Sequence, residues 1–120
     1  MFAETDAIER DRNLLSKISN IIVGIVEPVQ IILFGSRATG RARADSDYDL
    51  IVIEAEPYGP GHSRRQQATK LGLELSRLGI STDILMYSQE EIAKYREWRN
   101  HVVAHAFREG QILYERPERS

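Results

Sequence analysis

The sequence places a glycine-serine pair and two closely spaced aspartates on either side of a polar loop, in the segment LFGSRATGRARADSDYDLIVI (residues 33–53). Gly35 can adopt backbone angles that are closed to other residues, which lets a ligand approach the main chain. Ser36 can cap a short helix that follows it, and it can offer its hydroxyl and N–H groups to an anion. Gly35 and Ser36 are therefore predicted to cradle a phosphate group.

Three aspartates could supply metal ligands. Asp47 and Asp49 are two residues apart at the start of an apolar run, so both carboxylates are predicted to point to one face of a strand. Neighbouring carboxylates repel unless a cation lies between them, and their oxygens suit Mg²⁺ held together with substrate phosphates. Asp83 interrupts the apolar run 80–87, so it either faces solvent or joins the other two at the sheet edge. Three aspartates can hold two metal ions about 3.5–4 Å apart, an arrangement typical of phosphoryl or nucleotidyl transfer.

Two arginines lie in the loop between these groups. Arg37 and Arg43 are candidates for phosphate contact because of their charge and their proximity to the Gly-Ser pair. The alternative is that both are solvated loop residues, which is common for arginine.

The surrounding pattern predicts the elements that position these residues. Apolar residues with helical spacing occur over 7–26, and Pro28 prevents continuation of that helix. Short apolar runs predict strands at residues 29–34, 49–53 and 80–87. The fold class is therefore α/β or α+β, with a small mixed sheet of three to four strands flanked by helices. The pattern does not set the directions of the strands.

The second half of the chain contains a loop and two predicted helices. Prolines and glycines predict a loop over residues 57–63, and a helix follows that ends before Gly79. Ser88 precedes Glu91 by three residues, the spacing of a capping box, and a last helix is predicted from there to Gly110.

Length and composition limit the class of protein. The 120 residues suit one domain, residues 1–120, with 42% hydrophobic and 28% charged residues. A formal net charge of −2 gives no general basic field, so direct nucleic-acid binding is not expected. The absence of cysteine excludes disulfides and cysteine nucleophiles. A charged N-terminal segment and the lack of a long apolar run predict a cytoplasmic protein without a membrane span.

The motif resembles that of a known enzyme superfamily. Gly35-Ser36, ten intervening residues and Asp47-x-Asp49 are similar to the G-S-x10-D-x-D signature of polymerase-β-type nucleotidyltransferases. The run GSRATGRARADSDYDL resembles the minimal, MNT-type branch, and the ending HAFREGQILYERP is similar to the close of such a domain. The resemblance implies the nucleotidyltransferase fold. It also implies that Gly35 and Ser36 bind the triphosphate.

The same resemblance implies roles for the three aspartates and for a partner. Asp47 and Asp49 would bind two Mg²⁺ ions, while Asp83 would bind one of them and activate the acceptor hydroxyl. The substrate would be ATP or another NTP. Larger relatives bind small acceptors with an added helical domain, so the acceptor here is expected to be a partner protein. The resemblance implies an antitoxin that adenylylates a tyrosine of a HEPN toxin.

Other interpretations compete with this one. A Walker A loop is excluded because Arg41 and Ala42 stand where that motif needs Lys and Ser or Thr. His101 and His105 have helical spacing that could chelate a metal, but two histidines near a helix end are more often surface residues. Residues 99–105 also resemble the Arg-x5-His motif of HEPN ribonucleases, which are helical bundles, and we interpret the match as coincidence. For function, a non-catalytic antitoxin and a small-molecule nucleotidyltransferase remain alternatives.

Overall fold

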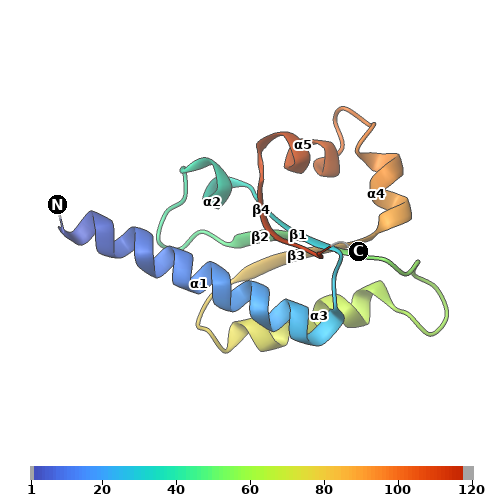
Figure 1. The fold of residues 1–120 in the computed structure, drawn as a ribbon, viewed down its shortest axis with the longest axis horizontal. Coiled ribbons are helices and arrows are strands. Elements are labelled where there is room, and N and C mark those ends of the chain that lie inside the picture. The colour runs from blue at the N-terminus through green and yellow to red at the C-terminus, as the bar shows by residue number, and fades with distance from the viewer. Residues whose placement is uncertain (1, 118–120) are drawn as a thin grey trace.

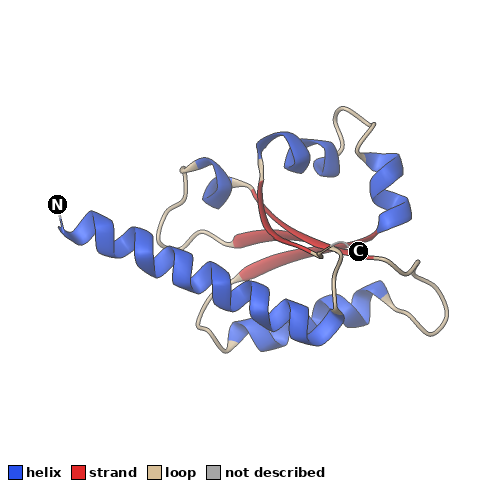
Figure 2. Ribbon diagram, in the orientation of Figure 1, coloured by secondary structure: helices blue, strands red, loops and turns tan. Residues whose placement is uncertain are grey.

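A computed structural model describes residues 2–117 of the chain, with side chains described from Arg10 onward. A four-stranded mixed sheet lies between helices on both of its faces (Figure 1), and Figure 2 shows the helices and strands by colour. The elements in chain order are α1 (Phe2–Val26), β1 (Gln30–Phe34), α2 (Ser36–Thr39), β2 (Tyr48–Glu54), α3 (Arg64–Ser76), β3 (Thr82–Ser88), α4 (Gln89–Tyr95), α5 (Val102–Glu109) and β4 (Gln111–Glu115). This architecture confirms the predicted fold class.

The sequence pattern did not set the directions of the strands. The observed directions bring the predicted site residues to one end of the sheet. The strand order is β3-β2-β1-β4, with β1 antiparallel to both β2 and β4. Strand β2 is parallel to β3, and α3 forms the crossover between them. The end of β1 therefore meets the beginnings of β2 and β3.

Two apolar cores sandwich the sheet. Helices α1 and α3 cover one face, and α4 and α5 cover the other (Figure 1). The first core contains Ile18, Ile22, Ile31, Leu33, Tyr48, Leu50, Val52, Leu71, Leu75 and Met86. The second core contains Ile32, Ile51, Ile53, Ile92, Val103 and Ala106. Alternate residues of β2 thus serve opposite cores, as the period of two in a strand requires.

The prediction of one helix from Ser88 to Gly110 was wrong. The capping box is present, because Ser88 Oγ accepts from the Glu91 N–H and Glu91 accepts from the Ser88 N–H. Helix α4 nevertheless ends at Tyr95, and α5 begins only at Val102. His101 caps α5 in an extended conformation, with Nδ1 accepting from the Val103 N–H at 3.1 Å, and it stacks on Tyr95. The break lets both helices pack on the sheet, although no proline or glycine marks it.

A strand after Gly110 also escaped the sequence pattern. Strand β4 adds to the edge of β1, and Ile112 on it is 57% exposed, so the segment lacks the apolar run of a buried strand. Gly110 permits the turn into β4, because a Cβ there would lie 2.7 Å from the Leu33 carbonyl oxygen. Close backbone approach of this kind requires glycine.

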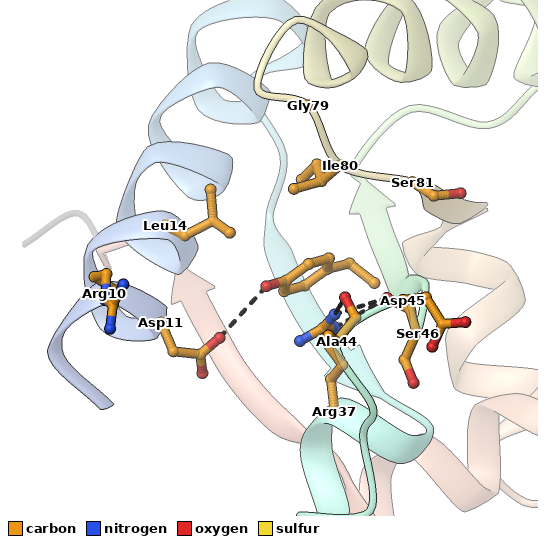
Figure 3. A pocket seen from close by; sticks show the side chains of 11 residues that line it. Arg10, Asp11, Leu14, Arg37, Ala44, Asp45, Ser46, Gly79, Ile80 and Ser81 are labelled. Carbon is orange, nitrogen blue, oxygen red and sulfur yellow. Dashed lines mark hydrogen bonds between the residues drawn. The ribbon is translucent and has the colours of Figure 1, made fainter. Parts of the chain in front are cut away.

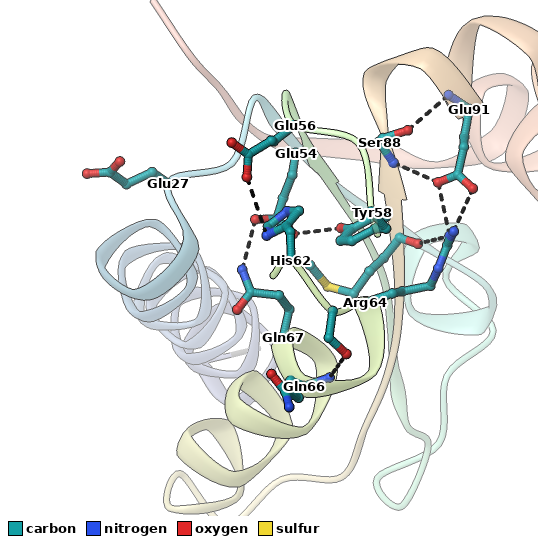
Figure 4. A network of polar contacts seen from close by, with 12 residues as sticks. Glu27, Glu54, Glu56, Tyr58, His62, Arg64, Gln66, Gln67, Ser88 and Glu91 are labelled. Atoms are coloured by element: carbon teal, nitrogen blue, oxygen red, sulfur yellow. Dashed lines mark hydrogen bonds and ion pairs between the residues drawn. The ribbon is translucent and has the colours of Figure 1, made fainter. Parts of the chain in front are cut away.

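A network of polar contacts surrounds Glu54 at the last residue of β2, the end of the strand that is farther from the Gly-Ser turn (Figure 4). Glu54 is buried and accepts hydrogen bonds from Tyr58 Oη at 2.6 Å and Gln67 Nε2 at 3.0 Å. His62 stacks on Tyr58 and lies 3.6 Å from Glu54. These contacts fix the predicted loop between β2 and α3. Within residues 2–117, no helix is long and apolar enough to cross a membrane.

Candidate active site

The predicted site residues meet where β1 ends and where β2 and β3 begin. Across the β1–β2 pair, Phe34 lies opposite Asp49, so Gly35 follows β1 directly beside that carboxylate. Across the parallel β2–β3 pair, Asp49 is the register partner of Asp83. Register partners in a sheet point to the same face. Two segments that are far apart in sequence thus bring these carboxylates together.

The three carboxylates differ in exposure. Asp49 is half-buried, whereas Asp47 and Asp83 are exposed. Asp49 lies on the face of β2 that also carries Ile51 and Ile53, the side covered by α4 and α5 farther along the strand. The site therefore has one recessed carboxylate with two solvent-facing carboxylates near it.

The pKa of Asp49 reflects its burial and the two carboxylates near it. Burial raises the pKa of its carboxyl above the ordinary value of 3.8, and the negative charges of Asp83 and Asp47 raise it further. No ion pair in the described part of the chain includes any of these three side chains. The excess negative charge around Asp49 therefore favours an external cation.

The carboxylates of the site suit a cation whose remaining ligands are water molecules and substrate phosphates. Among the side chains of residues 10–117, no three histidine, cysteine or carboxylate groups lie so that they could hold a metal ion. Magnesium usually keeps several waters and binds through one or two carboxylates together with substrate phosphates. Asp47 and Asp49 offer such carboxylates. Their chemistry and their uncompensated charge therefore fit Mg²⁺ that arrives with a triphosphate.

Gly35 cannot be replaced without disturbing Asp49. Its φ of +73° lies in the left-handed region that other residues rarely adopt. A Cβ built on Gly35 would also overlap the Asp49 carboxylate. The glycine thus lets the backbone approach the recessed carboxylate closely.

Ser36 occupies the first position of α2 and does not cap it. Gly35 is the N-cap residue, and no side chain caps this helix. The expectation that Ser36 would cap the short helix was wrong, because the chain already turns into the helix one residue earlier. Ser36 is half-buried and directly follows Gly35, and its predicted phosphate contact stays a prediction.

The two arginines have different surroundings. Arg37 donates to the backbone carbonyl of Ser46 from Nε at 3.1 Å and from Nη2 at 2.8 Å. The same Nη2 donates to the carbonyls of Arg43 at 3.3 Å and Ala44 at 3.2 Å. Arg43 is exposed, and its N–H donates to Ser46 Oγ. The structure thus shows Arg37 holding a loop, and its phosphate contact remains a prediction like that of Arg43.

A pocket of about 630 Å³ lies behind the Asp-x-Asp segment and not at its carboxylates. It is lined by residues of α1, the loop 41–47 and the turn before β3, with Arg37, Asp45 and Ser46 on one wall (Figure 3). Tyr48 lines it because the pleat points this side chain away from Asp47 and Asp49.

Sequence reasoning missed Tyr48 and Asp11. Tyr48 is 4% exposed, and its hydroxyl donates to Asp11 Oδ1 at 3.4 Å. Burial is the main cause that raises the pKa of Tyr48, although nearby Arg37 lowers it. The period of two in the Asp-Tyr-Asp segment already places Tyr48 on the opposite face, and this signal could have identified it. No local signal could have identified Asp11, which is 37 residues away.

Comparisons with solved structures agree with the fold. A mutant MntA–HpeT toxin–antitoxin structure is 19% identical and matches over 85% of this chain and 73% of that chain, with a TM-score of 0.56. A toxin–antitoxin structure with AMP-PNP is 19% identical over 84% and 73% of the two chains, with a TM-score of 0.54. A Sulfolobus solfataricus protein assigned as a nucleotidyltransferase is 15% identical over 93% and 86%, with a TM-score of 0.59.

The family match rests on sequence. No protein of curated function matches the chain. The family model described as "Polymerase beta, Nucleotidyltransferase" matches residues 16–119, a span that includes the Gly-Ser pair and all three aspartates. The chain therefore belongs to the polymerase beta nucleotidyltransferase family.

Proposed function

We propose that this chain transfers a nucleoside monophosphate, AMP in particular, from an NTP to a hydroxyl group of a partner protein. The observation that carries the proposal is the meeting of Gly35, Asp49 and Asp83 at one sheet edge, with uncompensated negative charge on the carboxylates. Gly35 and Ser36 hold the triphosphate, and Arg43 contacts a phosphate. Asp47 and Asp49 hold both Mg²⁺ ions, and Asp83 holds one of them.

The reaction forms one bond to phosphorus and breaks another. The oxygen of the acceptor hydroxyl attacks the α-phosphorus of the NTP, and the bond to the leaving pyrophosphate breaks. The Asp83 carboxylate accepts the proton of the attacking hydroxyl, because it faces solvent beside Asp49 and has no described partner of its own. Magnesium ions held by these aspartates would neutralise the negative charge that develops in this reaction.

The similar structures favour a protein acceptor. Two of them are toxin–antitoxin complexes, and one of these holds AMP-PNP, an analogue of ATP. We therefore propose that the chain is the antitoxin of such a pair and that it modifies a tyrosine of a HEPN-type toxin. We further propose that residues 1–120 act as one domain in the cytoplasm, where ATP and Mg²⁺ are abundant.

Intact mass spectrometry of the partner tests this function. Co-expression with a HEPN-type protein encoded beside this chain, followed by incubation with Mg²⁺ and ATP, is expected to raise the mass of that partner by whole AMP units. The Asp47→Asn/Asp49→Asn double variant is the control and should give no mass increase. A stable complex whose mass does not change with the wild-type chain would favour an antitoxin that acts by contact alone.

Nucleotide binding should depend strongly on divalent cations. Without Mg²⁺ the triphosphate faces the charges of Asp47, Asp49 and Asp83 directly, so we expect NTP affinity to rise at least about tenfold when Mg²⁺ is added. Calorimetric titration in Mg²⁺ and in EDTA measures this difference. Equal affinity in both conditions would contradict a site in which the cation bridges carboxylates and phosphates.

A further inference from the structure

Arg37 joins the two halves of the Gly-Ser and Asp-x-Asp motif. It lies in α2 directly after Ser36, yet its guanidinium bonds to the loop 41–47 that precedes β2. The Ser46 carbonyl, which accepts from both Nε and Nη2, belongs to the peptide bond that leads into Asp47. A planar guanidinium can hold one acceptor with two donors in this way, whereas the ammonium of lysine is a point charge.

Tyr48 also contacts the Arg37 side chain. The Arg37 guanidinium lies over its ring, 4.1 Å from the centroid. The Tyr48 N–H donates to the Ser81 carbonyl at 2.9 Å, and its hydroxyl donates to Asp11 of α1. The residue between the two aspartates is thus anchored to α1, α2 and the turn before β3.

The Asp47 side chain, in contrast, forms no hydrogen bond or ion pair among the described residues. It is exposed, so its position depends on the two residues that flank it. Both of these residues, Ser46 and Tyr48, are held by Arg37. All the hydrogen bonds described for the Arg37 side chain end on backbone carbonyls.

We propose that Arg37 and Tyr48 form a clamp that fixes Asp47 relative to Asp49 and to the Gly-Ser turn. In this role, which rests on the proposed function, Arg37 is a positioning residue, in place of the phosphate contact that is predicted from its charge. The clamp links the turn that holds the triphosphate to the carboxylates that hold the cation. Hydrogen bonds from an ionised donor are about twice as strong as neutral ones, and stacking on the tyrosine ring adds to them. One arginine can therefore order the whole loop.

Amide hydrogen exchange on the nucleotide-free protein tests the clamp without any transfer assay. Arg37→Lys keeps the charge but loses the planar fork, and Tyr48→Leu removes the ring beneath it. We expect either change to speed exchange across residues 41–47 by about tenfold, because the bonds that order this loop are lost. Tyr48→Phe keeps the ring and should leave exchange in the loop within about twofold of the wild-type rate. Arg12→Lys, at an exposed position beside Asp11, is the matched control and should change nothing in the loop.

Binding of Mn²⁺ in the presence of a non-hydrolysable ATP analogue provides a second measurement. We expect Arg37→Lys to weaken the apparent Mn²⁺ affinity about tenfold. The Arg37→Lys/Tyr48→Leu double variant should bind Mn²⁺ with an affinity within about twofold of that of the more weakly binding single variant. The reason is that the effects of two residues that act as a unit do not add.

The possible outcomes separate the clamp from the proposed function. Unchanged exchange in the loop, together with additive losses of the apparent Mn²⁺ affinity in the double variant, would overturn the clamp and favour direct contact of Arg37 with phosphate. A wild-type chain that binds nucleotide but transfers none would refute the proposed function. In that case the exchange measurement would still decide whether the clamp exists.

Discussion

Asp83→Asn is expected to lower the rate of nucleotide transfer by about 10²–10⁴-fold while it leaves most of the NTP affinity intact. The asparagine amide is nearly the same size as the carboxyl, but it lacks the charge that holds a cation and the basicity that accepts a proton. Asp47 and Asp49 lie on β2 and its preceding loop, so they can still hold Mg²⁺ that arrives with the triphosphate. Binding and chemistry should therefore separate in this variant.

Single-turnover transfer and direct nucleotide binding, measured side by side, check this result. Asp47→Asn is the informative comparison, since it should impair both binding and transfer. Circular dichroism of both variants controls for folding, which should persist because Asp83 and Asp47 are exposed. A near wild-type transfer rate for Asp83→Asn would show that another group accepts the proton. Asp45 lines the pocket behind the Asp-x-Asp segment, and Glu54 lies at the far end of β2 with Tyr58 and Gln67, so neither is placed to be that group.

The motif could be interpreted from sequence because its residue types carry their own chemistry. Gly35, Ser36, Asp47 and Asp49 lie within one segment, and a strand period of two already places both aspartates on one face. The proximity of Asp83 depended on the direction of β3, which follows from the crossover through α3 and not from any local pattern. The resemblance to a known signature supplied this step, and the parallel register agrees with it.

Contacts between distant segments could not be predicted. The hydrogen bonds of Arg37 end on a loop that folds back onto α2, and no local pattern indicates this contact. The break between α4 and α5 depends on His101, whose side chain caps α5 and stacks on Tyr95. Strand β4 pairs with the edge of β1, a contact that residues 111–115 do not reveal by their own pattern. In each case tertiary packing decided a structure for which local propensity was neutral.

Asp49→Asn is expected to abolish transfer and, at the same time, to make the metal-free protein more stable at neutral pH. Burial raises the pKa of this carboxyl, and the charges of Asp83 and Asp47 raise it further. The folded chain therefore binds the Asp49 proton more tightly than the unfolded chain does. The resulting stabilisation is complete below the unfolded-state pKa and is lost as the pH rises through the folded-state pKa. At neutral pH the ionised Asp49 thus disfavours folding, and the neutral amide removes that cost.

Thermal unfolding between pH 3 and pH 7 in EDTA measures this effect. The wild-type Tm should fall, relative to that of Asp49→Asn, as the pH rises through the raised folded-state pKa, which leaves the variant with the higher Tm at pH 7. Asp83→Asn removes an exposed carboxylate and should raise the Tm less. With Mg²⁺ and a non-hydrolysable ATP analogue the order should reverse, because a ligand that binds only the folded state stabilises the wild type alone. A variant that is less stable than the wild type in EDTA at pH 7 would show that Asp49 serves the fold. That result would contradict the idea that the ionised Asp49 carboxylate lowers the stability of the metal-free protein and is present because it binds a cation.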